Sequence, residues 1–231
     1  MTSLGQYAWG ENENSIYSHL YIGGSADFQT VGGVNGGVKI TTETNYPWGN
    51  SIAYKINPAT DGVNFNLILR IPAWSSEFQI RVNNQEATYN LSDGYATINR
   101  PWQKGDEVTL TLDMKPRRVY ANSKVRANAG AVCVTRGPIV YCIEGVDNGD
   151  NLAAIQLPRQ AELIETSDNA SPLGNIVTLS AKARRVKPSK KLYSFAPPTY
   201  DETTIKLIPY YAWGNRETSG EPNSMRVWIN E

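Results

Sequence analysis

Apolar and polar residues alternate along most of the chain, which is the pattern of half-buried β-strands. In Phe65–Ile71 every second residue is apolar, so one face of that strand is expected to lie in a core. Helical periodicity is nearly absent, and the pattern predicts an all-β fold. The predicted strands are Ile16–Ile22, Val38–Glu43, Phe65–Ile71, Phe78–Val82, Tyr95–Asn99, Val108–Leu112, Val132–Thr135, Ile139–Glu144, Ile176–Ala181, Thr203–Ile208 and Met225–Ile229.

The number of predicted strands is larger than one small sandwich normally holds. We therefore predict two antiparallel, jelly-roll-like β-sandwich domains in tandem. The composition changes over Lys115–Asn122, which places the boundary near residue 120 and gives domains 13–120 and 121–231. Residues 1–12 are predicted to be the end of a helix, because apolar residues fall there at helical spacing before a glycine.

Three connections are also predicted. Asn83-Asn84 and Lys104–Asp106 carry residues that suit tight turns, so both are expected to be hairpin connections. The basic segment Arg184–Pro198 is expected to be a solvated surface loop.

Charge and composition narrow the range of functions. The 231 residues contain 22 Lys and Arg against 22 Asp and Glu, which disfavours binding to nucleic acid or to an anionic membrane. No apolar run is long enough to span a bilayer, and a soluble protein is expected. The single histidine, His19, lies in a predicted strand and is more simply structural than catalytic.

Tryptophans are the strongest binding candidates. Trp74 and Trp102 end strands and are expected to cover a core, whereas Trp48 follows a proline turn and is equally compatible with exposure or with contact to a neighbouring domain. A sugar-binding site would use Trp48 or Trp213, and the latter is followed by Asn215 and Arg216.

Catalytic candidates are weaker. Glycosidase chemistry normally needs two carboxyl groups, and no motif specifies such a pair; Asp106 is more simply a turn cap. Cys133 and Cys142 flank a Gly-Pro turn and are expected to face each other as a buried, inert pair. The available carboxylates are Asp27, Glu43, Asp106, Glu144 and Glu217.

Several strings together resemble the C-terminal part of the bacterial β-L-arabinofuranosidase family, glycoside hydrolase family 127. The likeness covers nearly the whole chain in the order of the family. The strings are Ser3–Tyr7, Ile16–Ile22, Thr44–Trp48, Leu69–Trp74, Gly94–Ile98 with Arg100 and Trp102, Arg136–Tyr141, Pro209–Arg216 and Met225–Trp228.

The resemblance implies an enzyme in which an (α/α)₆ barrel performs the chemistry with a zinc-bound cysteine, and two β-sandwich domains follow it. The zinc-binding motif is absent here, and Cys133 and Cys142 match no zinc ligand of the family, so no catalytic or metal residue and no cofactor is expected in this chain. The chain is then a non-catalytic accessory region that packs on the barrel, in a bacterial cytoplasm or periplasm. The residues expected to contact the barrel are Leu4, Tyr7, Trp9, Tyr46 and Trp48.

Two alternatives stay open: an independent carbohydrate-binding module and, less favoured, an autonomous glycosidase. Arabinose-containing glycans and a second copy of the chain are the other expected partners.

Overall fold

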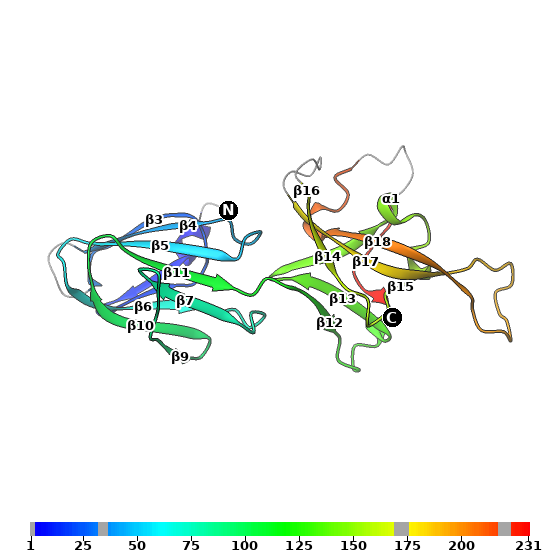
Figure 1. Ribbon diagram of the computed structural model, residues 1–231, viewed down its shortest axis with the longest axis horizontal. Coiled ribbons are helices and arrows are strands. Elements are labelled where there is room, and N and C mark those ends of the chain that lie inside the picture. Colours follow the sequence, from blue (N-terminus) through cyan, green and yellow to red (C-terminus); the bar gives the residue numbers. More distant parts are fainter. Residues whose placement is uncertain (1–2, 32–36, 169–175, 217–222) are drawn as a thin grey trace. The chain divides into compact units, whose positions relative to one another are not determined.

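The computed structural model describes residues 3–31, 37–168, 176–216 and 223–231. The chain divides into two compact units, Met1–Met114 and Lys115–Glu231 (Figure 1). The division lies a few residues before the predicted boundary near residue 120, because β12 (Pro116–Tyr120) pairs with β13 (Ala131–Arg136) of the second unit. No helix in the described ranges is long and apolar enough to cross a membrane.

The first unit is a sandwich of two sheets. One sheet contains, in order, β1 (Trp9–Asn12), β2 (Ser15–Ser18), β6 (Val63–Arg70), β10 (Tyr95–Trp102) and β9 (Asn90–Ser92). The other contains β3 (Gly24–Phe28), β4 (Val38–Thr44), β5 (Ser51–Pro58), β11 (Asp106–Leu112), β7 (Phe78–Val82) and β8 (Gln85–Glu86). Their facing side chains form one buried cluster, to which Leu67 and Leu110 contribute from opposite sheets. Trp102 is completely buried there, and its Nε1 donates to the Phe65 carbonyl oxygen at 3.0 Å.

The turns of this unit agree only in part with expectation. Asn83 and Asn84 both have positive φ and connect β7 to β8 as a hairpin. The prediction of a hairpin at Lys104–Asp106 is wrong, because β10 and β11 belong to different sheets and the turn carries the chain between them. Asp106 does cap this turn, since its carboxylate accepts from the backbone N–H of Gln103 at 2.9 Å.

The N-terminal segment differs from the expected helix end. Only Leu4–Tyr7 is helical, as the 3₁₀-helix η1, and Trp9–Asn12 instead forms β1 against β2. The Trp9 ring packs edge-on against Phe28 and Tyr54, at centroid distances of 5.5 and 5.9 Å. Burial of that indole accounts for the strand, because its apolar surface gains more in the core than a short isolated helix could supply.

The second unit is built from a single nine-stranded sheet. Besides β12 and β13 it contains β20 (Ile229–Asn230), β15 (Ile155–Gln156), β17 (Ile176–Val186), β18 (Tyr200–Pro209), β14 (Ile139–Glu144), β19 (Met225–Arg226) and β16 (Ile164–Asp168). Pairing of β13 with β14 closes the strand order on itself, so the layers of this sandwich are parts of one continuous sheet. Its short helices are η3 (Arg126–Asn128), α1 (Gly145–Asn148), η4 (Leu152–Ala154) and η5 (Tyr210–Ala212).

The core of the second unit lies inside this closed sheet. Tyr141, Leu179 and Leu207 belong to it, and they come from β14, β17 and β18. Because alternate residues of a strand point to opposite faces, the neighbours of these residues point outward. The predicted surface loop begins after Val186, since Arg184 and Arg185 are still paired within β17 and β18.

Candidate functional site

The outer face of β17 and β18 is rich in hydroxyl groups. Thr178 and Ser180 alternate with the buried Leu179 on β17, and Thr204 and Lys206 flank the buried Ile205 on β18. Ser180 lies opposite Lys206 in the register of the two strands. The alternation therefore gathers polar side chains on one surface.

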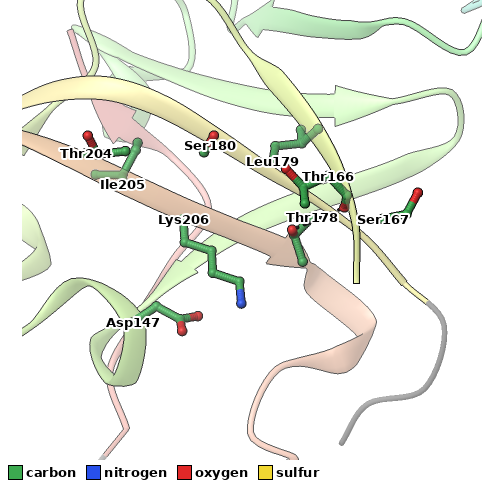
Figure 2. A pocket seen from close by; sticks show the side chains of 9 residues that line it. All are labelled: Asp147, Thr166, Ser167, Thr178, Leu179, Ser180, Thr204, Ile205 and Lys206. Carbon is green, nitrogen blue, oxygen red and sulfur yellow. Dashed lines mark hydrogen bonds between the residues drawn. The ribbon is translucent and has the colours of Figure 1, made fainter. Parts of the chain in front are cut away.

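A cavity of about 340 Å³ lies on this surface (Figure 2). Figure 2 shows Asp147, at the end of α1, and Lys206, on β18, extending toward the same side of it. The volume falls within the range of ligand pockets, about 300–1,000 Å³. The cavity is lined by Asp147, Thr166, Ser167, Thr178, Leu179, Ser180, Thr204, Ile205 and Lys206.

The one-turn helix α1 is fixed against β18 by Asn148. Its Nδ2 donates to the carbonyl oxygens of Glu144 and Lys206, at 2.9 Å each, and its Oδ1 accepts from the Lys206 N–H at 2.9 Å. This side chain uses both its donor and its acceptor groups on backbone partners, so the position of Asp147 at the cavity is well defined.

A buried ion cluster lies beside the cavity. Glu144 is completely buried; its Oε1 accepts from the Gly214 N–H at 3.0 Å and from Asn223 Nδ2 at 2.9 Å, and its Oε2 accepts from Arg216. Arg216 also donates to both carboxylate oxygens of Asp147, at 2.9 and 2.6 Å. These bonds to Asp147, with those to Glu144, raise the pKa of Arg216.

The carboxylates of this ion cluster are not arranged for acid–base catalysis. General acid–base catalysis requires one carboxyl group free to take up a proton and one free to act as a base or nucleophile. Glu144 and Asp147 share one guanidinium, and Glu144 has no exposed surface. Of the other proposed carboxylates, Asp106 is a turn cap and Asp27 and Glu43 are exposed on strands, while Glu217 lies outside the described residues.

Aromatic side chains surround the turn that follows β18. Tyr210, Tyr211 and Trp213 expose 46%, 54% and 42% of their surface, whereas Ala212 between them is buried against Cys142 and Ile208 of the outer face. Asn215 Nδ2 donates to the carbonyl oxygens of Ala212 and Trp213, at 3.2 and 3.3 Å. Asn215 thus holds the turn that carries Trp213, whereas Arg216 binds the carboxylates of Glu144 and Asp147.

The residues proposed to contact a barrel all lie in the first unit. Leu4, Tyr7 and Trp48 are exposed, Tyr46 is half-buried with its ring edge-on to Tyr21 at 5.2 Å, and Trp9 is partly buried against the core of its own unit.

His19 has a structural setting. Its Nδ1 lies 2.9 Å from the Tyr95 hydroxyl, and its ring stacks on Tyr17 at a centroid distance of 5.7 Å. It follows the end of β2 and links that strand to β10, which accounts for the residue without a catalytic role.

The two cysteines, both within the described residues, do not fit a zinc site. A cysteine binds zinc as the thiolate. Burial raises the pKa of Cys133, and burial together with the smaller effect of the nearby Glu144 carboxylate raises the pKa of Cys142 to about 12, so both side chains favour the protonated thiol. Both are buried free thiols on the β13–β14 hairpin. In the described part of the chain no three His, Cys, Asp or Glu side chains are grouped so as to hold a metal ion.

Comparisons with known proteins cover both units. Residues 15–114 match the family model described as "Beta-L-arabinofuranosidase, GH127 middle domain", and residues 116–230 match "Glycoside hydrolase family 127 C-terminal domain". A non-reducing end β-L-arabinofuranosidase of Bifidobacterium longum subsp. longum is 34% identical, over 94% of this chain and 34% of its own length.

Solved structures give the same assignment. A family 127 β-L-arabinofuranosidase of Geobacillus stearothermophilus T6 matches 99% of this chain with 39% identity and a TM-score of 0.90, and another family 127 β-arabinofuranosidase matches 99% with 33% identity and a TM-score of 0.84. The chain covers 35% and 36% of those structures, about a third of each. This chain, which matches the models of the middle and C-terminal domains, therefore belongs to glycoside hydrolase family 127.

Proposed function

We propose that this chain is a non-catalytic accessory region of a β-L-arabinofuranosidase-like glycoside hydrolase, which packs on a catalytic barrel and stabilises it. The observation that carries the proposal is the coverage: the chain matches the middle and C-terminal domains and spans about a third of its relatives. The commitment of Glu144 and Asp147 to one arginine supports it, because that pair is then unsuited to acid–base work.

The first unit offers a surface for such a barrel at its N-terminal segment. Leu4 and Tyr7 lie on η1 and are exposed, as is Trp48 after the Tyr46-Pro47 turn. Exposed apolar side chains of this size favour burial against a partner, at about 25 cal/mol per Å² of apolar surface.

The test is association with the separately expressed catalytic part of the Geobacillus relative. The double variant Leu4→Ser/Tyr7→Ser is expected to weaken binding at least about tenfold, a loss of about 1.4 kcal/mol. Leu91→Ser is the matched control, because Leu91 is 51% exposed against 49% for Leu4 but lies on β9. Equal binding by both variants would contradict the proposed contact surface, and no association of the unaltered chain would contradict the accessory role.

A further inference from the structure

The cavity and the aromatic turn of the second unit are parts of one surface. Gly214 and Arg216 follow Trp213 and bind Glu144 and Asp147, and Asp147 lines the cavity. Figure 2 shows the chain leaving the end of β18 and turning beside the cavity. Buried Ala212 fixes the middle of that turn on the outer face, so the exposed rings on either side of it are held in place.

The charges of this surface balance. Glu144 and Asp147 carry two negative charges, and Arg216 and Lys206 carry two positive ones. A phosphate or another anion would meet two carboxylates without a surplus of cations, so a neutral ligand fits best. Hydroxyl groups in the cavity can both donate and accept hydrogen bonds, and the hydroxyl groups of a sugar do the same, so the two can pair in either direction.

We propose that this surface of the second unit binds a neutral carbohydrate chain. Its sugar rings would lay their C–H faces on Tyr210 and Trp213, and its hydroxyls would bond to Asp147, Ser180 and Thr204. Aromatic rings suit this role because they offer a large apolar face at a small cost in side-chain entropy. The ion cluster acts as the rigid support of the site, and the binding step involves no bond making or breaking.

The test uses the whole chain and a panel of neutral oligosaccharides: an arabino-oligosaccharide, xylohexaose and cellohexaose. Titration calorimetry and tryptophan fluorescence are followed in parallel. At least one member is expected to bind, and Trp213→Ala is expected to weaken that binding at least about tenfold, the size of effect that a central aromatic contact has. Trp48→Ala, the exposed tryptophan of the first unit, is expected to leave affinity within about twofold.

A second pair of variants examines the cavity itself. Thr204→Val removes a cavity hydroxyl and is expected to weaken binding about three- to tenfold, whereas Thr109→Val removes one from the outer face of β11 and is expected to have no effect. The proposal is overturned if no oligosaccharide of the panel binds at about 10 mM, or if binding survives Trp213→Ala or is lost in Trp48→Ala. The binding experiment contains no catalytic barrel, so none of these results bears on the accessory role.

Discussion

Arg216 holds the outer face of the second unit together, because it is the cation shared by Glu144 and Asp147. Arg216→Met leaves the completely buried Glu144 without its cation, and breaking a buried pair in this way costs about 3–5 kcal/mol. We expect a loss of that size in urea unfolding at pH 7.

Arg159 is the matched control for that substitution. Its guanidinium pairs with Glu231 at 2.9 Å but its side chain is 73% exposed, so Arg159→Met should cost no more than about 1 kcal/mol. Equal losses in the two variants would contradict the structural role given to Arg216.

Buried acids of both units make stability sensitive to alkali. Burial raises the pKa of Cys142 to about 12 and also raises those of Tyr21, Tyr54 and Tyr141. The unfolded thiol loses its proton near pH 8.5 while the folded thiol keeps it. Unfolding therefore releases a proton above that pH, and the free energy of unfolding should fall by about 1.4 kcal/mol per pH unit from the thiol alone. Urea titrations between pH 8 and 10 measure this slope, and Cys142→Ala should flatten it; an unchanged slope in that variant would refute the assignment.

At the scale of elements, the connection between β17 and β18 carries the most exposed large apolar side chains of the described residues. Leu192, Tyr193 and Phe195 in this connection expose 95%, 91% and 112% of their surface. They bury almost nothing within the chain, so replacing all three with Ser should change the melting temperature by less than about 2 °C. The same change should reduce self-association, read by sedimentation velocity, because large exposed apolar groups drive contacts between copies. A fall in melting temperature, or self-association that persists unchanged, would contradict this reading.

How far the elements follow from the sequence depends on how local their causes are. The β5 segment Ser51–Pro58 alternates between exposed and buried positions as a strand should, yet it is missing from the predicted strands although its pattern was legible. The β13–β14 hairpin had a local signal in its Gly-Pro turn, but the closure of the second sheet had none, because it also needs pairings between distant strands, such as β13 with β20 and β14 with β18. For the same reason the turn at Lys104–Asp106 was mistaken for a hairpin: its residues reveal a tight turn but not which sheets it joins.

The candidate site shows the same limit at the scale of the molecule. The sequence string around Trp213 pointed to Asn215 and Arg216, and in the structure Asn215 binds the backbone of the Trp213 turn while Arg216 binds Asp147. It could not reveal that Arg216 binds carboxylates roughly seventy residues earlier, nor that hydroxyl groups of β16, β17 and β18 line one cavity. Only long-range pairing places those residues side by side.

The two units should fold independently. Among the residues that the structure describes, the buried clusters of the two units share no member, and the strands of each unit pair only with strands of that unit. Residues 1–114 and 115–231, expressed separately, should each unfold in one cooperative transition whose midpoint lies within about 5 °C of its counterpart in the whole chain. Non-cooperative unfolding of either piece would show that the units depend on each other.

Hydrolysis of para-nitrophenyl β-L-arabinofuranoside, with zinc and a reductant present, tests the accessory role most directly. The whole chain is assayed alone and together with the catalytic part of the Geobacillus relative. We predict no turnover by the chain alone, and a longer-lived or more active catalytic part when the chain is added. Turnover by the chain alone would contradict the account.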